Sequence, residues 1–234
     1  MNVNIYDRQL ICKIEYSRRK TIQIKLLPPD NVSIKAPYGF SNMEIKAFVE
    51  GKRNWIKKKL DFFEQHNIQV MDRKYVEGEK LLLYGDEYIL SITENNHKKS
   101  SVALESHKLI VNSPSAKSEL IKQVLEAFYR IKAKEIIFSL SLKYEGLLGL
   151  KPNMIRIKKQ KKRWGSCSSK GNLNFNFKLA MAPIRVIDYV VLHEFCHLRH
   201  MNHSREFWNL VEEYMPDYLE KREWLRINGH RLEL

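Results

Sequence analysis

The segment His193-Glu194-Phe195-Cys196-His197 constrains the chain more than any other stretch of its sequence. Four residues make slightly more than one helical turn, so on a helix the two histidines point in the same direction. Two imidazoles on one helix face can share a zinc ion, each at about 2.0–2.1 Å. Glu194 can reach a water on that metal without being a ligand, and can serve as its general base. The neighbouring residues are mostly apolar, and burying these polar groups without a metal would be costly. We therefore predict that 184–200 is one helix carrying a zinc site.

A catalytic zinc ion needs a third protein ligand and keeps a fourth position open. His200 shares the helix stripe but lies roughly 10.5 Å along the axis from His193, which would require nearly opposed ligands. Glu212 or Glu213, on the next predicted helix, would give a site of two histidines and one glutamate. His203 follows a predicted turn, and a chain that reverses there brings the third imidazole back over the pair. We predict that His203 completes the site.

The hydrophobic patterns predict an α+β fold with a β-rich N-terminal half and a mostly helical C-terminal half. A capping-box pattern at Ser41–Glu44 opens a helix that is expected to kink at Gly51 and end near Gln65. Alternation of apolar and polar residues predicts strands at 21–26, 32–35, 80–84, 88–93, 101–105 and 108–111. Helical periodicity predicts helices at 116–144, 206–214 and 217–227. Strands at 154–159 and 173–179 are predicted to pair as a hairpin that turns at Lys170-Gly171-Asn172.

Ser113-Pro114-Ser115 gives the clearest boundary signal in the chain. It places a proline between small polar residues, after a predicted strand and before a long predicted helix. We therefore expect two regions. Residues 1–113 would form a β-rich N-terminal region with one helical segment, and residues 114–234 would form the domain that carries the metal site.

Two segments around the predicted site, Arg163–Ser169 and Asp188–Trp208, resemble the YgjP-like metallopeptidase family. That family is related to the SprT-like zinc proteases and, more distantly, to other zincins. The resemblance implies that residues 114–234 form a zincin-like metallopeptidase domain with an H-E-x-x-H helix. It implies zinc on His193, His197 and His203, with Glu194 catalytic. It also implies that an extended peptide lies along an edge strand, for which residues 173–177 are our candidate. An ordinary half-buried strand is the alternative interpretation of these residues. Shorter matches carry the resemblance over nearly the whole chain: Ala36-Pro37, Trp55-Ile56, Tyr84-Gly85 and 224–230.

Several residues near the site have candidate supporting roles. Gly165 would allow a close backbone approach to the metal cleft, although a packed turn with Trp164 in the core is an equal interpretation. Asp188 is a candidate to orient a ligand imidazole, with an ordinary acidic residue in the first turn of a helix as the alternative. Cys196 points away from the ligand face, and we interpret it as core packing. The candidates to stabilise an oxyanion are Arg163, Tyr214, Tyr218 and His230.

The chain has 41 basic and 27 acidic residues, for a formal net charge of +14. This excess favours contact with nucleic acid or nucleotides, although a solvated lysine-rich surface is the alternative interpretation. The basic residues are densest at 156–163, where six of eight are Lys or Arg. The three cysteines form no C-x-x-C pair, which argues against a disulfide framework. The sequence contains neither a run of about 18 apolar residues nor a signal-peptide pattern, so we expect a cytoplasmic protein without a membrane partner.

Three functions fit these observations. The leading hypothesis is a zinc-dependent metallopeptidase that acts on a peptide or protein, with Glu194 as general base. The second is a metal-dependent phosphohydrolase of nucleoside triphosphates, which the positive charge would suit. The third is a nucleic-acid-associated protease that cuts bound protein partners. A basic cleft without a groove beside 173–177 would favour the second, and a continuous basic face would favour the third.

Overall fold

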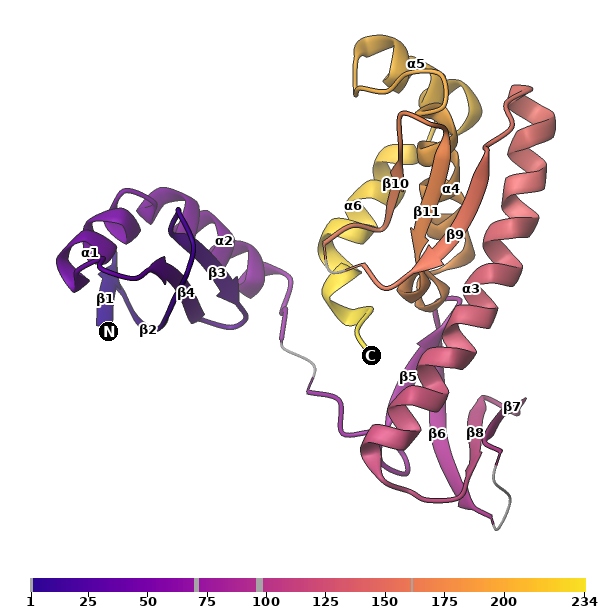
Figure 1. Ribbon diagram of the computed structural model, residues 1–234, viewed down its shortest axis with the longest axis horizontal. Helices are drawn as coiled ribbons and strands as arrows, with labels where there is room; N and C mark the ends of the chain where they lie inside the picture. Colours follow the sequence, from indigo (N-terminus) through magenta and orange to yellow (C-terminus); the bar gives the residue numbers. More distant parts are fainter. Residues whose placement is uncertain (1, 70–71, 96–98, 161) are drawn as a thin grey trace. The chain divides into compact units, whose positions relative to one another are not determined.

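The chain forms two units, Met1–Asp72 and Arg73–Leu234. The computed structural model (Figure 1) describes residues 2–69, 72–95, 99–160 and 162–234. Lys161, a member of the predicted basic run, lies outside these described residues. The predicted α+β fold is confirmed, because sheets dominate the N-terminal half of the chain and helices dominate the C-terminal half.

The boundary expected at Ser113-Pro114-Ser115 falls inside the second unit, between strand β8 (Lys108–Ser113) and helix α3 (Ser118–Leu148). Leu109 of β8 and Leu125 of α3 belong to one buried core. The proline and serines end the strand, but the helix then packs back on the same sheet. The contacts therefore divide the chain after Asp72 instead.

The first unit is a four-stranded sheet covered by two helices (Figure 1). Its strand order is β1-β2-β4-β3, with β2 and β4 parallel and the other pairs antiparallel. Ser41 and Glu44 form the predicted capping box at the start of α1, and the chain breaks at Gly51 before α2 begins. The elements are β1 (Asn2–Ile5), β2 (Arg8–Ser17), β3 (Gln23–Leu27), β4 (Asn31–Pro37), α1 (Asn42–Glu50) and α2 (Arg53–Gln65).

The second unit begins with another four-stranded sheet, in the order β5-β6-β8-β7. The long helix α3 runs from this sheet to a smaller third sheet (Figure 1) and contacts both of them. It continues past the predicted end at Tyr144 until Gly149, whose left-handed φ of 63° terminates it. The strands of this sheet are β5 (Lys80–Leu83), β6 (Asp86–Glu94), β7 (Ser101–Glu105) and β8.

The third sheet differs from the predicted hairpin. Its strands are β9 (Met154–Lys158), β10 (Gly165–Cys167) and β11 (Asn172–Asn176), in the order β10-β11-β9. β9 and β11 run parallel, and β11 instead forms its hairpin with β10. β11 is thus the central strand, with neighbours on both sides, so the expectation that residues 173–177 form an edge strand was wrong. The short strand β10, which the periodicity did not reveal, is one edge of this sheet.

Helix α4 (Ile184–Cys196) lies among the other elements of the second unit and contacts α3, β10, α5 and α6. Its α-helical part ends at Cys196 rather than at residue 200, and His197 is the C-cap. This early end lets the chain reverse before α5 (Arg205–Tyr214). The remaining elements are α6 (Tyr218–Asn228) and two 3₁₀ helices, η1 (Phe177–Met181) and η2 (Gly229–Arg231).

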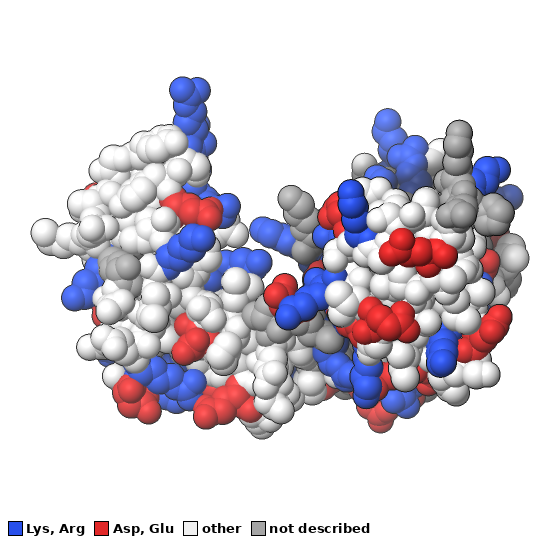
Figure 2. Space-filling view, turned by 90° about the horizontal axis from the view of Figure 1, so that it is seen from below, with Lys and Arg blue, Asp and Glu red and all other residues white. Residues whose placement is uncertain are grey.

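Charged side chains are mixed on the face of the molecule in Figure 2. Lys and Arg lie there in several separate groups, with Asp and Glu between them. Within the predicted basic run, Lys159 pairs with Glu126. Such pairing reduces the positive field of the run and favours the interpretation of a solvated surface. None of the described helices combines the length and apolarity that crossing a membrane requires.

Candidate metal centre

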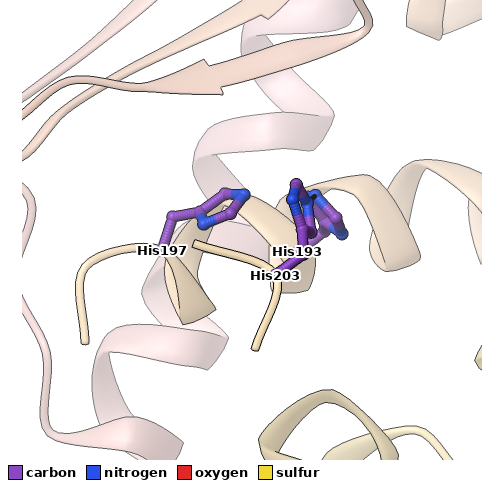
Figure 3. Close-up of side chains that lie close together, drawn as sticks. All are labelled: His193, His197 and His203. Carbon is purple, nitrogen blue, oxygen red and sulfur yellow. Dashed lines mark hydrogen bonds between the residues drawn. The ribbon is translucent and has the colours of Figure 1, made fainter. Parts of the chain in front are cut away.

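Three histidines meet at the C-terminal end of α4. His193 lies in the last turn of the helix, His197 is its C-cap, and His203 directly precedes Ser204, the N-cap of α5. Their imidazole rings turn towards one another (Figure 3), and one nitrogen of each lies within 4.8 Å of the others. The Nε2 atoms of His193 and His203 are 3.1 Å apart. Two nitrogen ligands of a tetrahedral zinc ion would be separated by roughly 3.3 Å. The group therefore has the donor type and spacing that suit a small divalent cation.

His197 is oriented by the backbone of the turn that follows it. Its Nδ1 lies 3.0 Å from the carbonyl oxygen of His200. A carbonyl oxygen only accepts hydrogen bonds, so Nδ1 carries the proton and donates. The lone pair of Nε2 then faces the other two rings, which is the tautomer that a metal ligand requires. His200 thus contributes its carbonyl group, and its own ring is not part of the three-histidine group.

His193 is held in the neutral form that metal binding requires. Burial lowers its pKa to about 3, helped by the nearby charges of His197, His203 and Arg222. Burial also lowers the pKa of His197. A neutral imidazole keeps the lone pair that binds a metal, so these two rings need not lose a proton at neutral pH.

His203 is exposed, and aromatic side chains of α5 and α6 hold its ring. The imidazole stacks on the indole of Trp208, with ring centroids 5.4 Å apart and planes inclined by 24°. It also meets the edge of Phe207 at 4.8 Å. Trp208 in turn stacks on Tyr218 at 5.3 Å and carries the guanidinium of Arg222 at 5.0 Å from its ring centre. The third histidine is therefore positioned through packing between two helices.

Glu194 lies beside the histidines with only 4% of its surface exposed. Its Oε2 atom is buried and has no hydrogen-bond partner among the described residues. Burial raises the pKa of Glu194 to about 8, and the charge of Arg163 opposes this shift.

Gly165 packs against Glu194, and an added Cβ at Gly165 would lie 2.6 Å from Cγ and 2.7 Å from Cδ of the glutamate. Only glycine therefore lets the backbone of β10 approach this side chain so closely, as the sequence led us to expect of Gly165.

A pocket of about 700 Å³ opens beside His193 and Glu194. Its walls come from α4, α6 and the chain that leads into β10. Among the predicted oxyanion candidates, Arg163 lines this pocket, whereas Tyr214 donates to the carbonyl of Leu147. The volume is in the range of ordinary ligand-binding sites.

Other candidates lie apart from the three histidines. Asp188 pairs with Lys143, with 2.9 Å between Oδ2 and Nζ, so it does not orient a ligand ring. Cys196 is buried in the core, as expected. Neither Glu212 nor Glu213 belongs to the group that the described residues form.

The chain matches one known protein family over most of its length. Among curated proteins, no relative matches the chain. A crystal structure of the metallopeptidase zymogen of Pyrococcus abyssi abylysin resembles it at 23% sequence identity, with a TM-score of 0.36. That match covers 40% of this chain and 92% of the other. A family model described as the YgjP-like metallopeptidase domain matches residues 20–228. The chain therefore belongs to the YgjP-like metallopeptidase family.

Proposed function

We propose that this protein is a zinc-dependent metallopeptidase in which His193, His197 and His203 hold the metal and Glu194 is the general base. The observation that carries the proposal is the grouping of three imidazole nitrogens within 4.8 Å beside a buried carboxylate. Three nitrogen ligands would leave the fourth position of a tetrahedral zinc ion open, which is typical of a catalytic rather than a structural zinc site. Zinc bound there would supply a Lewis acid that activates water and polarises a carbonyl group.

Glu194 is suited to accept and return a proton. Its buried Oε2 atom has no hydrogen-bond partner among the described residues, and Glu194 lines the pocket beside His193. A base acts most efficiently when its pKa lies near the working pH, and burial raises that of Glu194 to about 8. In the proposed reaction, Glu194 takes a proton from the attacking water and delivers it to the leaving amine.

The edge of β10 offers a place for an extended substrate. In the sheets formed by the described residues, β10 pairs with β11 alone, so its other edge has no strand partner. Gly165 in this strand lies directly against Glu194. A peptide that adds to this edge as a further strand would therefore pass beside the base and the three histidines.

The test combines metal content and hydrolysis on the same preparations. Wild-type protein is expected to cleave an unfolded protein substrate, to lose this activity with a chelator and to regain it with zinc. Glu194→Gln is expected to keep its zinc while its rate falls by about 10²–10⁴-fold, the usual contribution of a general base. The matched control is Glu212→Gln, the same change at an exposed position of α5. Full activity of Glu194→Gln with full zinc would contradict the assignment of the base.

A phosphohydrolase of nucleoside triphosphates is the second candidate. Two observations favour it. Residues 173–177 lie in the central strand β11 and its end, so they offer no open edge for a peptide. Three arginines also line the pocket beside His193, namely Arg163, Arg222 and Arg226. Phosphate groups are common partners of guanidinium groups. Nucleoside triphosphates are therefore included in the same assay. Phosphate release that depends on both zinc and Glu194, without peptide cleavage, would favour this function over the first.

A further inference from the structure

The pocket beside His193 and Glu194 has a cationic wall. Three guanidinium groups line it, and only that of Arg226 has an ion-pair partner among the described residues, the carboxylate of Glu223. Nε of Arg226 lies 2.6 Å from this carboxylate. The charges of Arg163 and Arg222 therefore remain available inside a concave surface next to the proposed site of chemistry.

Arg222 is held in place by an aromatic ring, and no ion pair joins it to an acidic side chain among the described residues. Its guanidinium lies over the face of Trp208, 5.0 Å from the ring centre. A contact with the face of an aromatic ring leaves the N–H groups of a guanidinium free to donate to an anion. Trp208 lies beside His193, with 5.8 Å between the ring centroids. A group bound to Arg222 would thus be close to the proposed metal site.

Arg163 approaches the pocket from a different element. It precedes Gly165 of β10, whereas Arg222 belongs to α6. Both side chains line the pocket that His193 and Glu194 also line. Two guanidinium groups from separate elements, with apolar residues such as Val190 and Leu219 in the same wall, form a site for a compact anion with an apolar stem. Glutamate and aspartate side chains have this character.

We propose that the pocket selects substrates with a carboxylate next to the scissile bond, and that Arg163 and Arg222 are the residues that determine this specificity. The carboxylate belongs to an acidic side chain or to the C-terminus of the substrate. This inference rests on the proposed metallopeptidase function, because the position of the carboxylate is defined relative to the bond that the proposed metal site would cleave.

Hydroxamates test the inference because they anchor a ligand on the zinc ion and present a side chain to the neighbouring pocket. The probes are peptide hydroxamates that carry glutamate, glutamine or lysine next to the hydroxamate, each with a free or an amidated C-terminus. Their dissociation constants are measured by calorimetry with the full-length, zinc-loaded protein. We expect the glutamate probe to bind about tenfold or more tightly than its glutamine counterpart, as a charge-assisted hydrogen bond would provide.

We expect Arg163→Gln and Arg222→Gln each to reduce the preference for glutamate to less than about threefold. We expect Arg222→Lys to retain part of the preference, because lysine keeps the charge but lacks the planar donor group. Because the arginines lie on different elements, either variant tests the proposal if the other does not fold. Arg185→Gln is the matched control, since Arg185 is exposed on α4 and does not line the pocket.

The outcomes separate the inference from the function on which it rests. If probes with a free C-terminus bind more tightly than amidated ones whatever their side chain, the carboxylate that the pocket selects is the C-terminus of the substrate. Equal binding of the acidic and amide probes to the wild type would overturn the specificity while leaving the metallopeptidase function in place. A preference that survives both glutamine variants would overturn the role of the two arginines. Failure of all the hydroxamates to bind would contradict the metal site itself, and the inference would fall with it.

Discussion

Gly165 of β10 packs directly against the side chain of Glu194 on α4, so that an added Cβ would lie 2.6 Å from Cγ of the glutamate. Atoms at such a distance overlap, and either the strand or the carboxylate has to move. The φ angle of Gly165 is not among the positive values of the chain, so the constraint at this position is the space that Glu194 occupies. The position of the proposed base therefore depends on the absence of a side chain at residue 165.

We predict that Gly165→Ala folds but displaces Glu194 and lowers the rate of hydrolysis by about 10²-fold, since a shift of about 1 Å in a catalytic group has this effect. Its zinc content should stay unchanged, because Glu194 is not a proposed ligand. Gly146→Ala is the control, as an added Cβ there meets nothing within 4 Å. An active Gly165→Ala protein would mean that the position of Glu194 is not critical.

His200 and His203 allow a direct test of the metal ligands. His203→Ala should weaken zinc binding by more than about 100-fold, because it removes a direct ligand rather than a supporting group. His200→Ala should bind zinc nearly as well as the wild type, since His200 supports His197 through its backbone carbonyl, which alanine retains. Zinc affinity is measured by competition with a coloured chelator. If instead His200→Ala loses zinc affinity and His203→Ala keeps it, His200 is the ligand.

The stack of His203 on Trp208 predicts that the indole supports the metal without touching it. Trp208→Leu should lower zinc affinity by about 10–100-fold, the range observed when a supporting group of a metal ligand is lost. Trp208→Phe should recover part of this affinity, because a smaller aromatic ring can still stack. Trp55→Leu in the first unit is the control. Unchanged affinity in Trp208→Leu would mean that the turn before α5 positions His203 unaided.

The close grouping of the three histidines was predictable from the sequence. The spacing of His193 and His197 places both rings on one side of α4, and the turn after His200 brings His203 to them. These relations depend on helix geometry and on one short reversal of the chain. The capping box at Ser41 and the break at Gly51 were predictable for the same reason. That His203 binds the metal stays a prediction.

Long-range packing was not predictable from the same patterns. Alternation in residues 173–177 indicates a strand but does not say which strands flank it, so β11 proved to be central rather than an edge. Trp208 and Arg222 meet because α5 and α6 pack together, and no spacing rule links them. The boundary signal at Pro114 was equally local, whereas the division of the chain depends on where α3 packs.

The burial of Glu194 should make the stability of the metal-free protein depend on pH. In the metal-free protein, burial raises the pKa of this carboxyl from about 4.5 to about 8. Because the folded pKa lies above the unfolded one, the contribution of the protonated side chain to stability is complete below pH 4.5 and is lost as the pH rises to 8. Glutamine is neutral at every pH and avoids this loss. Metal-free Glu194→Gln should therefore be more stable than the wild type at pH 7, by about 3 kcal/mol.

Urea denaturation of both metal-free proteins between pH 4.5 and 8 measures this difference. His193 responds in the opposite sense, since its lowered pKa gives stability that is complete above pH 6.5 and is lost as the pH falls towards 3. The effect of His193 is common to both proteins and largely cancels in the comparison. The advantage of Glu194→Gln should therefore grow with pH, whereas Glu212→Gln, at an exposed position, should show no such trend. A constant difference across this range would mean that the fold does not hold Glu194 in its protonated form. A stability difference that grows with pH would mean that the fold gives up stability to keep a proton acceptor beside the three histidines.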